Sequence, residues 1–341
     1  MNRAASSQLK LTLRASVGTC VALGLARERC DVLPTTAYLL LGDRCRRTCA
    51  FCAQSSLSTS AAGMLSRVNW PEIDLGRLVS QLRRVSAASA PVSAAGRGCG
   101  CSALERICIQ VTDCAGALDD LCVLVPLLKS SAQVPVSVSY KPNSLADIGR
   151  LLSVGVDRLG IAIDAAEPHI YSEVKGGDLS SAKEYLVSAA SQHPGKISTH
   201  VIVGLGESEE SVIRLVSEFI ECGITVALFA FTPVRGTPME SRRQPDIGSY
   251  RRIQAATHLL RQGLVSIDDF RFEGGRIKSI EIEPERAIRA LQSGMAFQTS
   301  GCEGCNRPFY NERPGSVLYN YPRPLFASEV EQAIAATGLW K

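Results

Sequence analysis

Long apolar runs are missing from this sequence of 341 residues. None approaches the ~20 residues that a membrane-spanning helix needs, so we expect no membrane association. Histidine is scarce, with four residues, and none of them forms the H-E-x-x-H pattern of a metalloprotease. Basic residues are dispersed among acids, and the net charge of +4 is small. Nothing in this pattern therefore indicates a nucleic-acid partner.

Cysteine, by contrast, is abundant, with 13 residues. An odd number cannot pair completely, and disulfide-rich secreted chains are usually much shorter. We therefore expect a reducing, cytoplasmic compartment, in which clustered thiols bind metal and scattered thiols pack as small apolar groups. Residues 1–27 contain no acid, which imitates an organellar transit peptide. We predict an amphipathic helix there, and organellar targeting stays open as the alternative.

From residue 37 onward, short β-rich runs alternate with longer helical patterns. The runs are Ala37–Leu41, Arg106–Thr112, Val134–Val138, Arg158–Ile163, Ile197–Val203 and Thr225–Phe231. The helical stretches include Leu75–Ala87, Leu118–Ser131, Ser180–Ser191 and Glu210–Cys222. This alternation predicts an α/β fold with βαβ units and a parallel sheet.

The number of units decides the architecture. Six are readable, and strands around Phe270–Ile280 and Met295–Thr299 would complete a (βα)8 TIM-like barrel. A partial barrel of six units is the alternative. We expect three parts: a helical extension (residues 1–36), the barrel (37–300), and an irregular cysteine-containing tail with a helix (301–341). Residues 85–103 are of low complexity and are predicted to form a loop.

Three cysteines, Cys45, Cys49 and Cys52, directly follow the first barrel strand in the segment LLLGDRCRRTCAFCAQ. In a parallel barrel this loop lies at the carboxyl ends of the strands, where active sites form. Three thiolates in eight residues suit one iron–sulfur cubane, and they leave one of its irons open. A zinc site is the alternative, but zinc usually takes four ligands and no fourth Cys or His lies nearby in sequence.

The spacing C-x-x-x-C-x-x-C, with Phe51 before the last cysteine, closely resembles the signature of the radical S-adenosylmethionine (SAM) superfamily. The resemblance covers roughly residues 37–300 and is closest to biotin-synthase-like members. It implies a 4Fe–4S cluster that chelates SAM at its open iron. It further implies reductive cleavage of SAM to a 5′-deoxyadenosyl radical, which abstracts hydrogen from an unactivated carbon.

The same resemblance implies positions that bind SAM at the ends of the strands. These candidates are Phe51, Gln110, Asp164, Ile202, Gly204, Gly206, Glu207 and Val234. Gln110, with Thr112 and Asp113, stands where the family binds the amino group of SAM, although the common Gly-Gly-Glu is absent. Asp164 stands where biotin synthase uses an acid against the ribose, and a helix N-cap is the alternative role. The segments THVIVGLGESEES and FTPVRGTPME resemble those that form the adenine pocket.

A second pair, Cys302 and Cys305, lies in the tail. By spacing it is half a zinc site, a redox dithiol, or part of a second cluster. The tail resembles that of the two-subunit lipoyl synthases, which implies a sulfur-donating second cluster. The further ligand candidates are Cys108, Cys20 and Cys30, with Ser300 as an outside one. Biotin synthase holds its second cluster with cysteines inside the barrel, and here only Cys108 falls on such a position, because Ser198 replaces another.

The other cysteines and His200 receive simpler predictions. Cys99 and Cys101 are incidental loop residues. Cys114, Cys122 and Cys222 are expected in or near the core. His200 alternates with apolar neighbours on a strand, so it faces substrate inside the barrel or is a satisfied core residue.

The resemblance thus implies a sulfurtransferase that thiolates a protein-bound octanoyl-lysyl group, as one subunit of a lipoyl synthase. Its partners would be a homologous second subunit, an octanoylated carrier domain, and an electron donor such as ferredoxin or flavodoxin. Arg307, Arg313 and Arg323 in the tail would steer an acidic carrier, and a solvated rim with no partner is the alternative. The alternatives are a biotin-synthase-like enzyme that acts on a small molecule, and an inactive cluster-binding partner subunit.

Overall fold

The computed structural model describes residues 11–88, 104–312 and 315–340. Within these ranges the main feature is a seven-stranded sheet with the order β1-β2-β5-β6-β7-β8-β9. The strands from β2 to β9 run parallel, and β1 pairs antiparallel with β2 at one edge. The bounds are β1 (Leu13–Ala15), β2 (Thr36–Leu41), β5 (Arg106–Val111), β6 (Val136–Ser139), β7 (Arg158–Gly160), β8 (Ile197–Val203) and β9 (Thr225–Ala230).

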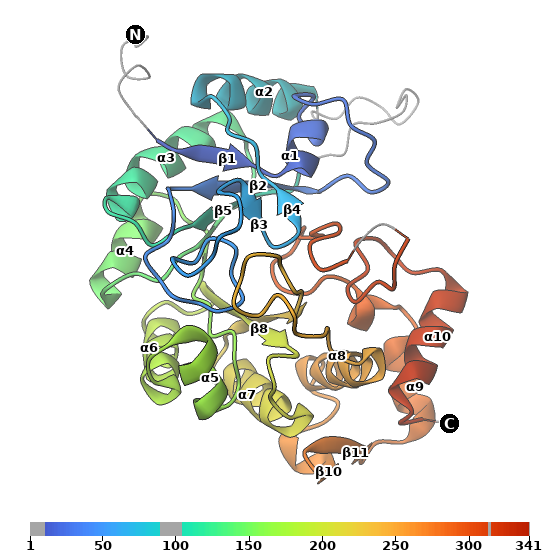
Figure 1. Cartoon of the computed structure of the whole chain (residues 1–341). Coiled ribbons are helices and arrows are strands. Elements are labelled where there is room, and N and C mark those ends of the chain that lie inside the picture. The colour runs from blue at the N-terminus through green and yellow to red at the C-terminus, as the bar shows by residue number, and fades with distance from the viewer. Residues whose placement is uncertain (1–10, 89–103, 313–314, 341) are drawn as a thin grey trace.

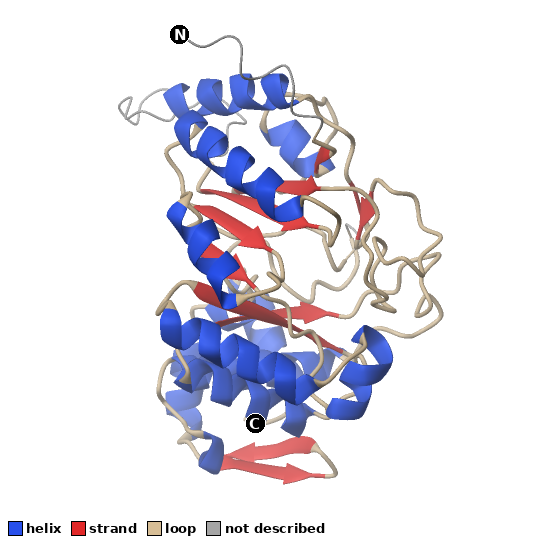
Figure 2. Cartoon of the chain, turned by 90° about the vertical axis from the view of Figure 1, so that its left-hand side faces the viewer, coloured by secondary structure: helices blue, strands red, loops and turns tan. Residues whose placement is uncertain are grey.

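Helices follow the outside of this sheet in chain order, from α2 at the top of Figure 1 through α3 and α4 to α7. In Figure 2, which views the molecule from the left-hand side of Figure 1, the helices lie in front of the sheet. The long loops gather on the right, past the ends of the strands. The bounds are α1 (Val17–Ala22), α2 (Leu75–Ala88), α3 (Ala117–Ser131), α4 (Leu145–Ser153), α5 (Pro168–Lys175), α6 (Leu179–Gln192), α7 (Glu209–Glu221), α8 (Ile247–Arg261), α9 (Pro284–Leu291) and α10 (Ala327–Thr337). None of the helices in the described residues is long and apolar enough to cross a membrane.

The six predicted β-runs are confirmed as the parallel strands, so the α/β prediction holds. The prediction of a seventh and an eighth parallel strand is wrong. The segment 270–280 instead forms a separate antiparallel hairpin of β10 (Phe270–Glu273) and β11 (Arg276–Ile280). Its turn is Gly274–Gly275, with both residues at positive φ, which is the geometry that closes a two-residue hairpin. Met295–Phe297 is a turn of 3₁₀ helix. The six-unit alternative therefore describes the sheet within the described residues.

The N-terminal segment also differs from its prediction. Residues 13–15 form strand β1 rather than helix, and α1 is only six residues long. The physical reason is the free edge of β2, whose backbone groups are paired by β1 through the register Leu13↔Leu41. A second small hairpin, of β3 (Met64–Leu65) and β4 (Val68–Asn69), follows the cysteine loop.

Side chains alternate between the two faces of the sheet, so that one face packs against the helices in the apolar core and the other borders a cavity. On β5, Ile107 and Ile109 are fully buried in the core beneath the helices, whereas Cys108 and Gln110 line a cavity on the opposite face. The same period of two puts Ser137 and Ser139 of β6 on the cavity side. The polar and thiol side chains of these strands therefore lie on the face that borders the cavity, which we call the inner face.

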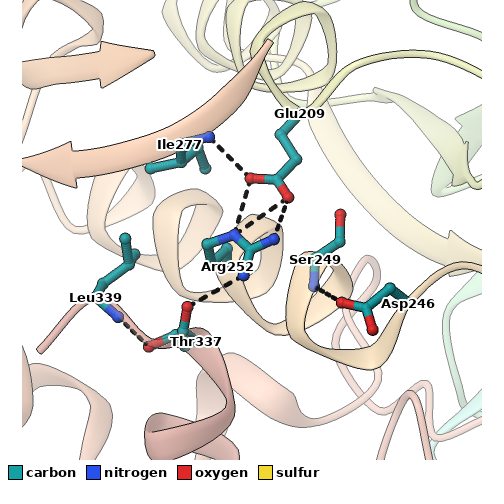
Figure 3. A network of polar contacts seen from close by, with 7 residues as sticks. All are labelled: Glu209, Asp246, Ser249, Arg252, Ile277, Thr337 and Leu339. Carbon is teal, nitrogen blue, oxygen red and sulfur yellow. Dashed lines mark hydrogen bonds and ion pairs between the residues drawn. The ribbon is translucent and has the colours of Figure 1, made fainter. Parts of the chain in front are cut away.

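A buried polar network fixes the beginning of α7, just after the glycine-rich turn that follows β8. Glu209 accepts three hydrogen bonds from Arg252 of α8, at 2.5–3.1 Å, and one from the backbone of Ile277 (Figure 3). Arg252 also donates to the carbonyl of Thr337 in α10. Both charged side chains are almost fully buried, so the network joins α7, α8, β11 and the C-terminal helix into one unit.

Candidate active site

A cavity of about 260 Å³ lies on the inner face of the sheet. Phe51 and Cys52 of the cysteine loop line it, and so do Cys108, Cys302 and Cys305. The strand register sets their depths. Cys108 is level with Tyr38 and Ser137, one layer deeper than Gln110, whereas the cysteine loop begins beyond the carboxyl end of β2. One cavity therefore contacts both predicted cysteine sites.

The loop that carries the triplet Cys45, Cys49 and Cys52 is held by hydrogen bonds within itself. The backbone of Cys45 donates to Gln54 at 3.0 Å, and that of Cys52 donates to Cys49 at 3.2 Å. The guanidinium of Arg44 donates to the carbonyls of Ala53 and Ser60, both at 2.6 Å. A loop without regular secondary structure is thus kept in one conformation.

The thiols of the triplet lie near one another and are partly shielded from water. Burial raises the pKa of Cys49 to about 12 and the pKa of Cys52 to about 11, and the neighbouring thiols add to both shifts. No group of three His, Cys, Asp or Glu side chains in the described part of the chain is spaced to hold a single metal ion. In a cubane each cysteine binds its own iron, and the three soft sulfur donors of this loop fit that group.

Asp113, which follows β5, contacts the loop that carries the triplet. The backbone of Asp113 donates to the sulfur of Cys45 at 3.3 Å, and its carboxylate pairs with Arg46 and Arg47 at 2.7 and 3.0 Å. Asp113 is therefore engaged by the loop. Gln110 lines the cavity, as expected of a ligand-binding residue, and its amide donates to the sulfur of Cys108 at 3.1 Å.

Asp164 lies after β7, is 4% exposed, and has a positive φ of 65°. Its carboxylate meets the Lys175 ammonium at 2.5 Å and Nε2 of His200 at 2.8 Å. The contact with His200 is an ion-pair distance without hydrogen-bond geometry, so Oδ1 has no hydrogen-bond partner in the described structure. Burial alone would raise the pKa of Asp164, but Lys175 and His200 together lower it well below its usual range.

These contacts refine two predictions. The carboxylate predicted to bind ribose is already held by two basic groups, and Asp164 is not among the residues that line the cavity. His200 does line it, beside Phe229, so it faces the interior and also contacts an acid. Sequence reasoning missed Lys175, although its place at the end of α5, near the strand end that carries Asp164, is a signal that could have found it.

The glycine-rich turn after β8 has a steric reason for its glycines. Gly204 has a φ of 105°, and a Cβ there would lie 2.9 Å from Pro245. Glu207 caps the turn by accepting from the backbone of Gly204 at 2.9 Å, and burial raises its pKa. Its other oxygen is buried without a hydrogen-bond partner in the described structure, but Gly204, Gly206 and Glu207 are not among the residues that line the cavity. Ile202 and Val234 line the cavity as predicted for adenine contacts.

The tail pair is brought to the barrel interior. Cys305 lies 3.4 Å from the hydroxyl of Tyr38, and Cys302 lies 3.7 Å from that of Ser137. Because Tyr38, Cys108 and Ser137 are adjacent in register, the three sulfurs of Cys108, Cys302 and Cys305 gather over one layer of the sheet. We call these three cysteines the trio. Burial, and then the thiols of Cys305 and Cys302, raise the pKa of Cys108 well above its usual range.

The remaining thiols lie elsewhere. Cys20 is a residue of α1 that packs in the core. Cys30 donates to the carbonyl of Val32 beside a second cavity of about 360 Å³. Neither is among the residues that line the cavity with Cys108, Cys302 and Cys305, and their contribution to a second cluster stays a prediction. Ser300 accepts a hydrogen bond from the backbone of Leu228 and is already engaged. Cys114 and Cys122 are partly buried, whereas Cys222 is exposed, contrary to prediction. Cys99 and Cys101 lie outside the described residues.

Two of the three tail arginines, Arg307 and Arg323, lie in the described residues, and their role toward a carrier stays a prediction. Arg307 lines the cavity, with its guanidinium stacked 3.9 Å from the ring centroid of Phe229. Arg323 is paired with Glu329 at 2.8 Å. Arg313 lies outside the described residues. Sequence reasoning assigned Arg307 to the surface because the irregular tail gave no sign of which residues point inward.

No model of a known protein family matches the chain. GTP 3′,8-cyclase from Limosilactobacillus fermentum is 22% identical over 175 residues, which are 50% of this chain and 51% of the cyclase. The chain thus matches about half the length of this curated relative.

Two solved structures match most of the chain at low sequence identity. The FeFe-hydrogenase maturase HydG from Carboxydothermus hydrogenoformans has a TM-score of 0.50 and 16% identity, over 89% of this chain and 66% of HydG. The methylornithine synthase PylB has a TM-score of 0.48 and 15% identity, over 89% of this chain and 82% of PylB. The likeness to HydG shows a shared fold with a mostly parallel sheet.

Fold, cysteine triplet and cyclase match together support the radical SAM superfamily, with the 4Fe–4S cluster and SAM that it implies. Neither comparison supports lipoyl synthase in particular, and neither bears on a second cluster.

Proposed function

We propose that this protein is a radical SAM enzyme that inserts sulfur into an unactivated C–H bond of a protein-bound octanoyl-lysyl group, as one subunit of a two-subunit lipoyl synthase. The observation that carries the proposal is the single cavity lined both by Phe51 and Cys52 and by the trio of Cys108, Cys302 and Cys305. A carbon-centred radical must meet its sulfur source within contact distance, so both sites have to face one substrate.

Cys45, Cys49 and Cys52 are the residues that would hold the first cluster, and the fourth iron would take SAM. With SAM and one electron, that cluster supplies a 5′-deoxyadenosyl radical, which takes a hydrogen atom from the substrate carbon. The chain's own residues would orient SAM: Gln110 towards the amino group, Ile202 and Val234 towards adenine, and Asp164 towards the ribose. For Asp164 this requires the contact with Lys175 or His200 to open, since both occupy its carboxylate.

The trio would hold the second cluster, whose sulfide becomes the inserted sulfur atom. Three sulfur donors on one cavity wall, two of them in contact with hydroxyl groups, are a donor set suited to iron. In the product a C–S bond would replace a C–H bond: the hydrogen would leave in 5′-deoxyadenosine, and the electron released when the carbon radical joins a sulfide would reduce an iron of the second cluster.

The rest of the cavity wall suits an acyl chain. It is formed largely by apolar side chains, among them Leu65, Ile202, Phe229 and Phe231. An octanoyl chain offers few polar groups, so selection of one methylene needs its lysyl attachment to be fixed on a carrier domain. A homologous second subunit would add the other sulfur. The electron donor, such as ferredoxin or flavodoxin, would approach the triplet loop, where the Arg46 side chain is 65% exposed.

The test is an anaerobic incubation of the reconstituted protein with SAM, reductant and an octanoyl-lysyl peptide. We expect 5′-deoxyadenosine and a peptide mass gain of one sulfur. Both sulfurs from this chain alone would contradict the two-subunit assignment. Turnover of dethiobiotin alone would favour a biotin-synthase-like enzyme, and a bound cluster without SAM cleavage would favour an inactive partner subunit.

A further inference from the structure

The deep end of the cavity is unusual in its charge. Three thiols and the phenols of Tyr38 and Tyr310 gather there, and all can carry negative charge. Among the described residues that line the cavity, Arg307 is the one side chain that is always positive. An arginine placed in a wall of thiols and aromatic rings calls for an explanation, because a desolvated cation is costly without a partner.

The position of Arg307 is fixed from both its side chain and its backbone. Its guanidinium stacks on Phe229 at 3.9 Å and donates to the carbonyl of Ser300 at 2.9 Å. Its backbone donates to the hydroxyl of Tyr38 at 2.7 Å, and that hydroxyl contacts the sulfur of Cys305 at 3.4 Å. The residue also has a φ of 35°, in the region that non-glycine residues avoid. The turn after Cys305 thus accepts backbone strain to keep this side chain at the cavity.

Within the described residues, one carbonyl acceptor and one aromatic face leave several N–H groups of the guanidinium without a partner that would neutralise its charge. The thiols nearby are neutral while protonated but become anionic when they bind iron. Their charge then has no other permanent counterpart among the described residues of the cavity wall.

We infer that Arg307 is a positioning residue for the second cluster: its positive charge compensates the thiolates of Cys108, Cys302 and Cys305 and so sets how tightly the cluster is held and how easily it is reduced. The inference rests on the second cluster of the proposed function. Net charge and hydrogen bonds near the sulfurs are the protein's means of tuning such a cluster. A purely structural role, stacking on Phe229, would make these properties insensitive to charge.

The experiment compares Arg307→Met, which removes the charge, with Arg307→Lys, which keeps it. Both are made in a background with Cys45, Cys49 and Cys52 replaced by Ala, so that only the second cluster remains. After anaerobic reconstitution, the loss of iron to a chelator and the reduction potential are measured. Arg323→Met is the matched control. It also removes an arginine of the tail, but Arg323 pairs with Glu329 and does not line the cavity. Phe229→Leu removes the stacking partner and keeps the charge.

We expect Arg307→Met to weaken iron retention by about 10–100-fold, as loss of an outer contact to a metal ligand does. Its reduction potential should become more negative, because reduction adds a negative charge that is no longer compensated. Arg307→Lys should stay close to the parent, as should the Arg323→Met control, and Phe229→Leu should have a smaller effect than Arg307→Met. Equal iron retention and potential in Arg307→Met and the parent would overturn the inference, and so would an Arg307→Lys protein that behaves like Arg307→Met.

A separate variant distinguishes failure of the inference from failure of the proposed function. If Cys302→Ser with Cys305→Ser in the same background leaves the iron content unchanged, the second cluster itself is absent from the trio. If that change removes the iron and Arg307→Met does not weaken it, only the role of Arg307 is wrong. Thermal unfolding followed by circular dichroism identifies any variant that has failed to fold.

Discussion

Cys45, Cys49 and Cys52 lie within eight residues of one loop, whereas Cys108 comes from strand β5 and Cys302 and Cys305 come from the tail. The triplet loop is fixed mainly by its own backbone and by Arg44, with further contacts to Asp113 after β5 and Val174 of α5. The trio exists only because the tail docks on the barrel, where Thr36 and Arg106 donate to the carbonyls of Gly304 and Glu303. A local site survives changes elsewhere, and a composite site depends on every contact that assembles it.

The largest expected effect is at the triplet. Cys49→Ala should abolish formation of 5′-deoxyadenosine by the reduced protein, because a cluster with two protein ligands cannot present SAM. The fold should survive, since the loop lies outside the helix-covered core. Chromatography of the nucleoside product measures the effect, with the exposed thiol change Cys222→Ala as control. Normal SAM cleavage by Cys49→Ala protein would remove the basis of the superfamily assignment.

At the composite site, the double change Cys302→Ser, Cys305→Ser should lower the iron content from about eight to about four per chain. The triplet is built independently, so this protein should still produce 5′-deoxyadenosine but transfer no sulfur. Iron and sulfide analysis beside the nucleoside assay measures both halves of the prediction. Loss of SAM cleavage together with the iron would show that the two sites are not independent.

Asp164→Asn should destabilise the protein by about 3 kcal/mol or more near neutral pH, because it leaves the buried Lys175 ammonium without its counter-charge. The folded-state pKa of Asp164 is lowered, so its stabilisation is complete above the unfolded value of about 3.9 and is lost as pH falls through the folded-state pKa. The difference between variant and wild type should therefore shrink below about pH 4.

Urea unfolding at several pH values checks this prediction. Asp119→Asn is the control, because its partner Arg150 is half exposed and a surface ion pair of this kind adds little to stability. A pH-independent difference for Asp164→Asn would contradict the ion-pair account.

The smallest effect is expected at the tail contact. Thr36→Val removes a hydroxyl that donates to the carbonyl of Gly304 at 2.7 Å, and should cost about 1 kcal/mol. The carbonyl keeps a second donor in Thr35, at 2.8 Å, so it is not left unpaired. We expect slightly lower stability and faster loss of iron from the trio, with unchanged SAM cleavage. If Thr36→Val reduced SAM cleavage as much as it reduced iron retention by the trio, the claim that the two cysteine sites are independent would be contradicted.

The same distinction explains what could be predicted from the sequence. The six parallel strands and the helices α2, α3, α6 and α7 follow local periodicity, and the triplet follows spacing within one loop, so these were accessible, whereas α4, α5 and α8 were not named. The hairpin at Phe270–Ile280 was missed because Gly274–Gly275 was not weighed as a turn, and the strand Leu13–Ala15 was missed because it forms by pairing with the edge of β2.

Contacts between distant segments were the least accessible. Cys108 was named as a partner of Cys302 and Cys305 from its strand position, and the structure brings the three together. Cys20 and Cys30 were named with them, because nothing in a sequence says which way a thiol in an irregular segment points. Lys175 and the inward position of Arg307 likewise arise only from tertiary packing.

The most direct test of the account traces the sulfur. The protein is reconstituted anaerobically with heavy-isotope sulfide, freed of excess sulfide, and given SAM, reductant and octanoyl-lysyl peptide, and the product is analysed by mass spectrometry. If the trio holds a sulfur-donating cluster on the cavity shared with the triplet, the single sulfur gained by the peptide carries the heavy isotope. A product that carries only light sulfur, or no thiolated product beside abundant 5′-deoxyadenosine, would contradict that claim.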